Sequence, residues 1–257
     1  MLSVAIITHN EEENIKDALE SVKWADEIVV VDSFSTDRTV EICKKYTDKV
    51  FVFEWPGFAE QKNKAVSLTT QPWVLVLDAD ERVTEALKNE ILKAIRDPYP
   101  SPNPLPQGEG ARGRVDGYYL ARKNHFAGRW IRHGGWWPDY TLRLFRRSKG
   151  SFQPREVHES IKINGKTGHL KNPLEHFTYK DTNDYLTRME NYSTLAAKEL
   201  YKEGRRACIF DIMLRPAATF FRMLFLQAGF LDGTYGFKLA YLYSRYTFNK
   251  YSKLRRM

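Results

Sequence analysis

The stretch that decides the fold is Trp73-Val74-Leu75-Val76-Leu77-Asp78-Ala79-Asp80. Its short apolar run is typical of a β-strand, and two carboxylates follow directly where the run ends. Ligands of an open α/β sheet bind beyond the carboxyl ends of its strands, so Asp78 and Asp80 lie where a functional site is expected. We therefore predict an α/β protein with an acidic site at one edge of its sheet.

The same alternation of short apolar runs and longer segments of helical period extends over residues 1–96. The predicted strands cover residues 4–8, 27–32, 49–53 and 73–78. The predicted helices cover residues 12–23, 37–46, 59–69 and 85–96, with Thr36 and Thr84 as N-caps. Strands joined by crossover helices predict a Rossmann-like, mostly parallel sheet that is flanked by helices.

The second half of the chain is less regular. Residues 97–114 place proline at every second position and then glycines, so we expect a flexible insertion without a function of its own. An amphipathic helix is predicted to begin near Thr182. We expect a catalytic domain over residues 1–200, which contains the insertion, and a basic helical extension over residues 201–257.

Polar and acidic residues end three of the predicted strands. They are Thr8-His9-Asn10-Glu11, the segment from Asp32 to Asp37, and the segment from Asp78 to Glu81. Asp78 and Asp80 stand two apart in an extended segment, so their carboxylates project to the same side and suit Mg²⁺ or Mn²⁺. Such an ion would hold the two phosphates of a donor and neutralise the charge of the departing diphosphate.

An isolated Asp-x-Asp is weak evidence by itself, because turns favour aspartate. The apolar strand before it and the acidic end of the second strand favour the functional interpretation. No Gly-x-Gly-x-x-Gly follows the first strand and no Gly-x-x-x-x-Gly-Lys-Ser/Thr occurs, which excludes dehydrogenases and P-loop enzymes. Lys62 opens a predicted helix, where it either reaches a diphosphate as a point charge or is a solvated surface lysine.

Three motifs resemble those of the family 2 glycosyltransferases of the GT-A fold. In order, they are Ala5-Ile6-Ile7-Thr8-His9-Asn10-Glu11-Glu12, Val29-Val30-Val31-Asp32-Ser33-Phe34-Ser35-Thr36-Asp37 and Leu77-Asp78-Ala79-Asp80-Glu81. The resemblance implies inversion at the anomeric carbon and ligation of the metal by Asp80, with Asp78 at the ribose or the metal. The predicted nucleotide-sugar-binding residues are Thr8, Asn10, Glu11, Asp32, Lys62, Asp78 and Ala79.

Motifs in the second half extend the likeness over nearly the whole chain. They are similar to the subgroup that builds lipopolysaccharide core, including β-1,4-glucosyltransferases. The motifs are Gly128-Arg129-Trp130-Ile131, His133-Gly134-Gly135-Trp136, Arg143-Leu144-Phe145-Arg146 and Val157-His158-Glu159. The stretch 97–114 departs from the subgroup, which supports its interpretation as an insertion.

Inverting transfer needs a general base near the acceptor hydroxyl, and the family usually supplies a late carboxylate. We predict Glu159 as this base, with Asp139 as the alternative. His158 and His176 are each predicted as a further metal ligand or diphosphate contact, although a lone histidine is more often structural.

Two adjacent tryptophans, Trp136 and Trp137, precede Asp139 by two or three positions. They either form a platform for an acceptor sugar or pack in the interior, which is the more common fate of large aromatic side chains.

The formal charge of +8 resides wholly in residues 201–257, which hold 11 basic and 3 acidic residues. Charges and a proline interrupt the apolar stretch 209–230, so a spanning helix is not expected there. Basic residues beside Phe, Leu and Met favour a helix that lies on anionic lipid, and packing on the catalytic domain is the alternative. No recognition motif accompanies the charge, so nucleic acid is not expected as a functional partner.

The cysteines and the N-terminal sequence indicate the cellular compartment of the protein. Cys43 and Cys208 lie far apart, which predicts neither a disulfide framework nor a zinc site and fits a reducing cytosol. The N-terminus lacks the pattern of a secretory signal. We therefore expect a cytoplasmic protein, and the resemblance to enzymes with lipid-linked acceptors implies that it is peripheral on the cytoplasmic face of the inner membrane.

The sequence thus predicts an inverting, metal-dependent hexosyltransferase. Its expected donor is a UDP-hexose, with glucose as the first choice, and its expected acceptor is a lipid-linked saccharide such as lipopolysaccharide core. One alternative is a catalytically inactive, basic, membrane-associated scaffold. A more distant alternative is a sugar nucleotidyltransferase, whose glycine-rich activation loop after the first strand is missing.

Overall fold

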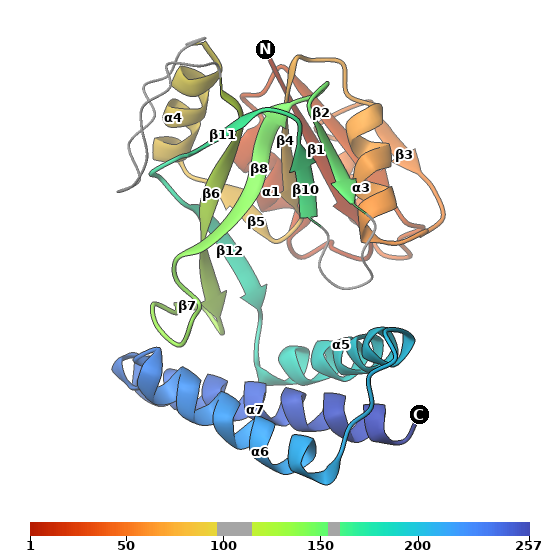
Figure 1. Ribbon diagram of the computed structural model, residues 1–257. Helices are drawn as coiled ribbons and strands as arrows, with labels where there is room; N and C mark the ends of the chain where they lie inside the picture. The colour runs from red at the N-terminus through yellow and green to blue at the C-terminus, as the bar shows by residue number, and fades with distance from the viewer. Residues whose placement is uncertain (97–114, 154–159) are drawn as a thin grey trace. The chain divides into compact units, whose positions relative to one another are not determined.

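The computed structural model describes residues 1–96, 115–153 and 160–257 (Figure 1). The predicted insertion at 97–114 lies outside the described residues. The described residues form two compact units. The first falls within 1–122, 140–153 and 160–176, and the second falls within 123–139 and 177–257.

Four strands of the first unit form the parallel part of the sheet. They are β1 (Leu2–Thr8), β2 (Glu27–Asp32), β3 (Val50–Val52) and β4 (Trp73–Asp78). β1 pairs in parallel with both β2 and β4, and β2 pairs in parallel with β3. The predicted parallel sheet is therefore confirmed. The carboxyl ends of its strands share one edge.

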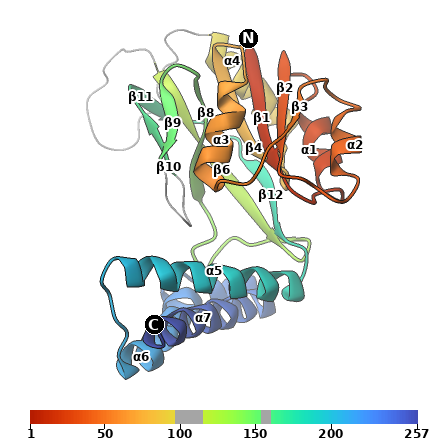
Figure 2. The ribbon, with the colours of Figure 1, turned by 90° about the vertical axis from the view of Figure 1, so that its right-hand side faces the viewer.

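Helices cover both faces of this sheet (Figures 1 and 2). They are α1 (Ile15–Val22), α2 (Thr39–Cys43), α3 (Phe58–Ser67) and α4 (Glu85–Arg96). Apolar residues of α1, α2 and α4 pack with Val4 and Ile6 on one face, whereas α3 packs with Ala5 and Ile7 on the other. Neighbouring residues of a strand point to opposite faces, so an apolar run such as β1 supplies both cores.

The remaining strands extend the sheet as a mixed structure. They are β5 (Glu81–Val83), β6 (Val115–Phe126), β7 (Arg129–Trp130), β8 (Asp139–Arg146), β11 (Lys166–His169) and β12 (Leu174–Tyr179). The strand order is β3-β2-β1-β4-β8-β6-β12-β5, and β8 runs antiparallel to β4. A separate ribbon joins β9 (Gly150–Gln153) to β10 (Ser160–Ile163).

One predicted helix cap is confirmed and one is wrong. Thr84 precedes α4, and its hydroxyl oxygen accepts a bond from the Leu87 amide at 3.2 Å. Helix α2 begins only at Thr39, with Arg38 at the N-cap. The amide of Thr36 instead donates to Asn10 Oδ1 at 2.8 Å, so this residue belongs to a loop contact rather than to the helix.

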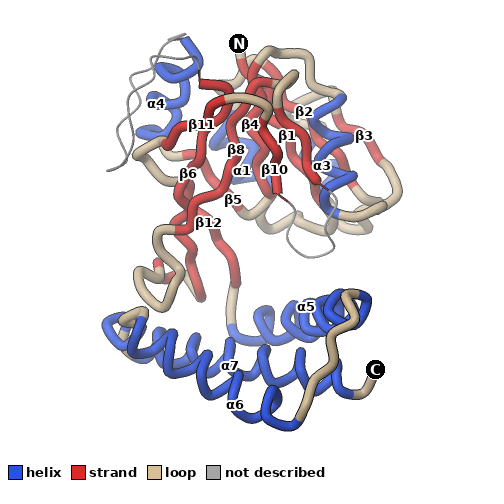
Figure 3. The backbone as a smooth tube through the Cα atoms, viewed as in Figure 1, coloured by secondary structure: helices blue, strands red, loops and turns tan. Residues whose placement is uncertain are grey.

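The second unit is mainly a helical bundle (Figure 3). It contains α5 (Thr182–Lys202), α6 (Ile209–Phe221), a π-helical turn η1 (Arg222–Leu226), a 3₁₀ turn η2 (Gly229–Asp232) and α7 (Thr234–Arg255). Its core is rich in aromatic residues, and Phe126, Trp136 and Tyr185 are all buried in it. The predicted helical C-terminal region is thus present. The assignment of residues 1–200 to catalysis stays a prediction.

None of the helices in the described part of the chain combines the length and apolar character needed to cross a bilayer.

A buried carboxylate accepts hydrogen bonds from three neighbouring segments at the amino end of the sheet. Glu27, at the start of β2, is 8% exposed and accepts hydrogen bonds from Ser3, Lys49 and Thr70. Burial by itself would raise the pKa of this carboxyl, but the hydrogen bonds outweigh it and lower the pKa to about 2.

Replacing Glu27 by Gln should lower the free energy of unfolding at neutral pH by about 1–3 kcal/mol, because charged hydrogen bonds are lost. The depressed pKa stabilises the fold above the usual value of 4.5, and this stabilisation is lost as the pH falls toward 2. Urea unfolding at pH 7 and pH 3.5 should therefore give a smaller difference between the two proteins at the lower pH. A difference that does not shrink would contradict this role, and exposed Glu85→Gln serves as the control.

Candidate active site

The strand register brings two of the predicted site residues side by side. Thr8 is the register partner of Asp32 on β2, and Ile7 is the partner of Asp78 on β4. The Thr8 hydroxyl is buried and has no hydrogen-bond partner among the described residues, so it can accept or donate a bond to a ligand. The Asp32 carboxylate is 1% exposed and accepts from the Ser35 amide at 2.8 Å, which shapes the loop after β2.

Asn10 and Glu11 connect the loops that follow β1 and β2. Asn10 has a φ of 54°, in the left-handed region, and its amide donates to Ser35 Oγ at 2.8 Å. The Glu11 amide donates to Thr39 Oγ1 at 2.8 Å. The Glu11 carbonyl accepts from Ile15 at the start of α1. These residues hold the shape of the edge around Thr8 and Asp32.

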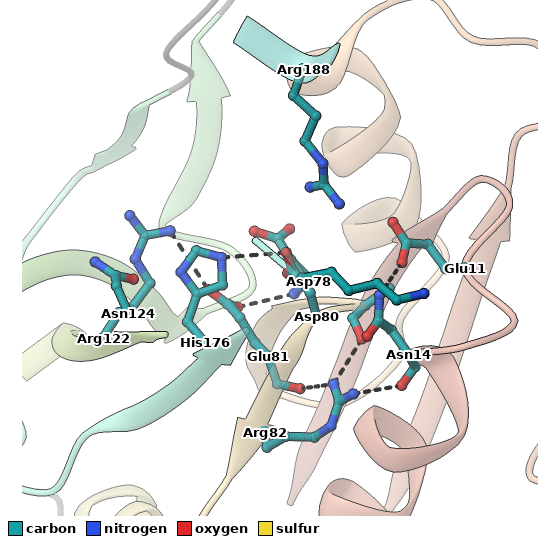
Figure 4. A network of polar contacts seen from close by, with 12 residues as sticks. Glu11, Asn14, Asp78, Asp80, Glu81, Arg82, Arg122, Asn124, His176 and Arg188 are labelled. Carbon is teal, nitrogen blue, oxygen red and sulfur yellow. Dashed lines mark hydrogen bonds and ion pairs between the residues drawn. The ribbon is translucent and has the colours of Figure 1, made fainter. Parts of the chain in front are cut away.

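Asp78 belongs to a network of ion pairs (Figure 4). Its Oδ1 lies 2.9 Å from Nζ of Lys62, and its Oδ2 accepts a hydrogen bond from the Arg143 guanidinium. Arg143 also donates to Glu81 at 2.6 Å. Nη1 of Arg122 lies 3.7 Å from the same Glu81 oxygen. Two carboxylates are thus surrounded by three cations.

Three of the five charges in this network are buried, whereas the Asp78 and Arg122 side chains are 27% and 22% exposed. The Arg143 and Lys62 side chains are each 3% exposed, and Glu81 is fully buried. Burial alone would raise the pKa of the Asp78 carboxyl, but the charges of Arg143 and Lys62 hold it far below its usual range. Asp78 is therefore ionised, and its position is fixed from two sides.

Asp80 faces a histidine from a distant part of the chain. Its Oδ2 lies 3.4 Å from Nε2 of His176, which β12 brings opposite Glu81 of β5. The Arg82 guanidinium donates to the Asn14 carbonyl at 2.8 Å (Figure 4). It also donates to the Ala79 carbonyl at 2.8 Å, and so anchors the turn that carries Asp80 to the start of α1. Ala79 itself is buried.

The Asp80 carboxylate fits a hard divalent cation, because Mg²⁺ and Mn²⁺ prefer carboxylate oxygens. The imidazole nitrogen of His176 beside it is a softer ligand, and both oxygens of Asp78 are engaged by cations. Among the described residues, no group of three or more His, Cys, Asp or Glu side chains is placed to hold a metal. One or two carboxylates together with phosphate oxygens and water are the usual arrangement for Mg²⁺.

The predicted acceptor residues are only partly described. Glu159 and His158 lie outside the described residues. Asp139 belongs to the second unit, where it accepts from Asn124 Nδ2 at 2.9 Å.

The two tryptophans before Asp139 have different environments. Trp136 is 5% exposed in the core of the second unit, so its interpretation as a sugar platform is wrong. Trp137 is half-buried and packs edge-on against Trp130 at 5.4 Å.

Sequence reasoning missed the part that Arg143, Glu81 and Arg122 play beside Asp78. A signal was present, because Arg143 is a charged residue inside the apolar strand 141–146. A buried charge of this kind needs a partner, but only the pairing of β8 with β4 shows which one it has.

The parallel sheet, its helices and its acidic edge define an α/β protein of the GT-A type. Residues 3–169 match the model of "Glycosyl transferase family 2". The chain therefore belongs to this family, as its three motifs predicted, and is a glycosyltransferase.

Two relatives that are matched over most of their length agree with this assignment. The chain is 31% identical to the lipopolysaccharide core biosynthesis glycosyltransferase LpsC of Rhizobium meliloti, over 98% of this chain and 91% of that protein. It is 29% identical to an uncharacterised glycosyltransferase of Rickettsia conorii, over 99% and 89% of the two chains. Among solved structures, the chain is similar to the crystal structure of S. aureus TarS 1–349, with 17% sequence identity and a TM-score of 0.46, over 99% of this chain and 90% of that chain.

Replacing Arg143 by Met should lower the free energy of unfolding by about 3–5 kcal/mol, because Asp78 and Glu81 would be left without their shared counter-charge. Chemical denaturation measures this loss. Arg143→Lys should recover part of it, because lysine keeps the charge but not the fork of donors. Exposed Arg147→Met on the same segment is the control, and an equal loss in both Met variants would refute the role of Arg143.

Proposed function

We propose that this glycosyltransferase transfers a hexose, with glucose as the first choice, from a UDP-sugar to a lipid-linked saccharide such as lipopolysaccharide core, with inversion. The observation that carries the proposal is the edge of the sheet, where the register pairs Thr8 with Asp32 and places Asp78 beside the neighbouring Ile7. Similarity to LpsC over nearly the full length of both proteins supports the class of acceptor. We place the enzyme in the cytoplasm, on the cytoplasmic face of the inner membrane.

In the proposed donor site, the base and ribose lie beside Thr8, Glu11 and Asp32. The unpartnered hydroxyl of Thr8 supports this assignment, because a buried polar atom without a partner is unfavourable until a ligand satisfies it. Asn10 and Ala79 shape the backbone around the nucleotide. Lys62 keeps Asp78 ionised and in place toward the ribose.

We assign the metal to Asp80 and His176, with His158 and Asp78 as the further predicted ligands. A bound Mn²⁺ or Mg²⁺ would offset the negative charge of the departing diphosphate. Asp80 fits this role better than Asp78, because Asp78 already neutralises Lys62 and Arg143.

For the acceptor half of the reaction, we propose that Glu159 takes the proton from the acceptor hydroxyl as that oxygen attacks the anomeric carbon. Asp139 is the alternative base. Its hydrogen bond from Asn124 holds the carboxylate in one orientation, which suits a base that must point at one hydroxyl.

Two other functions are compatible with the same fold. An inactive membrane-associated scaffold would keep the sheet but release no nucleoside diphosphate. A sugar nucleotidyltransferase would release pyrophosphate rather than UDP. One assay of the released products separates all three.

Replacing Asp80 by Asn should lower UDP release from UDP-glucose, in the presence of Mn²⁺ and acceptor, by about 10²-fold or more, because a charged ligand of the metal is lost. The control is Asp48→Asn, an exposed carboxylate that follows α2. Equal rates for Asp80→Asn and the parent enzyme would refute the assignment. A screen of UDP- and GDP-sugars with the parent enzyme identifies the donor.

Glu159→Gln should lower the rate of transfer to the acceptor by about 10²–10⁴-fold while leaving UDP binding unchanged, because only proton removal is affected. Calorimetric titration with UDP and Mn²⁺ checks the binding. Asp139→Asn is measured in parallel. If it loses transfer and Glu159→Gln does not, Asp139 is the base.

A further inference from the structure

Helix α6 leaves apolar side chains exposed along one face. Met213, Leu214 and Phe221 are 59–66% exposed, and their spacing of seven or eight residues places them on the same side of the helix. The π-helical turn η1 continues the row with Phe225 at 54% and Leu226 at 84% exposure. Side chains of this size are normally covered when they occur together.

Ring contacts join this row to α7. Phe237 of α7 is 56% exposed and packs edge-on against Phe220 of α6 at 5.4 Å. Phe220 contacts Phe221 at 5.9 Å, and Phe221 stacks on Phe225 at 5.7 Å. The exposed residues Met213, Leu214, Phe221, Phe225, Leu226 and Phe237 therefore form one surface, which we call the apolar face.

The residues around the apolar face are basic. Residues 205–257 contain ten Lys or Arg and only two acidic residues. Asp211 is paired with Arg215 at 2.6 Å. Asp232 is 4% exposed and accepts from the His133 amide at 2.8 Å, so neither acid presents a free charge beside the face.

Basic residues also occur directly within the row of exposed positions. Arg222 follows Phe221 on the same turn, and Lys238 follows Phe237. Arg245 occupies an exposed position of α7 two turns beyond Lys238. The surface thus combines large apolar side chains with positive charge.

We propose that the apolar face is a docking surface for an anionic lipid bilayer. Phe and Leu side chains would enter the boundary between headgroups and acyl chains, and the arginines and lysines would pair with lipid phosphates. The described helices do not span a membrane, so the contact is one of lying on the surface. A second copy of this chain fits less well, because a symmetric contact would bring like charges together.

This inference deepens the membrane contact of the proposed function by assigning it to particular residues. Only the biological role of this contact, which is to bring the enzyme to a lipid-linked acceptor, rests on the proposed function. Vesicle binding is measured without donor or acceptor, so a failure to transfer sugar and a failure to bind lipid are separate results.

The test is flotation of the full chain with vesicles that contain phosphatidylglycerol and with vesicles of phosphatidylcholine alone. The parent protein should float with the anionic vesicles and largely detach in high salt. The double variant Phe225→Ser/Leu226→Ser should bind them at least about tenfold more weakly, because two inserted apolar side chains are lost. The control variant, Val52→Ser/Trp55→Ser, removes two exposed apolar residues from the other compact unit and should float like the parent.

A second variant, Lys238→Gln/Arg245→Gln, tests the charge independently of the apolar residues. It should weaken binding to anionic vesicles by about fivefold or more for each lost charge near the surface. Circular dichroism confirms that each variant is folded. Equal flotation of the parent and both docking variants, or equal binding to neutral vesicles, would overturn the proposal. So would sedimentation that shows a dimer of the parent and a monomer of Phe225→Ser/Leu226→Ser.

Discussion

The parallel pairing of β1 with β2 and β4 is the constraint on which the site depends. Because the strands are in register, Thr8 aligns with Asp32 and Ile7 aligns with Asp78. A slip of one residue would turn each apolar side chain of β1 to the opposite face, and the cores on the two sides forbid it. The same packing that stabilises the sheet therefore also assembles its polar edge.

The buried charges beside that edge follow from the way β8 is added to the sheet. Pairing of β8 with β4 brings Arg143 to Asp78 and Glu81, and α3 supplies Lys62. Buried ion pairs contribute little net stability compared with apolar residues, but the loss of one partner is strongly destabilising. Here they hold Asp78 ionised in a single orientation. Asp80, on the next turn, contacts His176 instead.

The second unit uses aromatic residues in two ways. Phe126, Trp136 and Tyr185 fill its core, whereas the exposed aromatic residues of α6, η1 and α7 gather into the apolar face. Helical spacing explains how both occur within one segment, because one side of each helix packs inward and the other is left outside. The basic residues that carry the whole net charge of the protein are interspersed with the second set.

Local sequence determined the strands, the helices between them and the acidic residues at the strand ends, because period and strand composition are properties of neighbouring residues. The Asp78 and Asp80 motif and the resemblance to the family also rest on short local segments of the sequence. Only the tertiary structure decided that Asp78 pairs with Arg143 and Lys62, that Asp80 meets His176, and that Trp136 is buried. These contacts join residues that lie about 15 to 100 positions apart, and only strand pairing and packing determine which distant residues become neighbours.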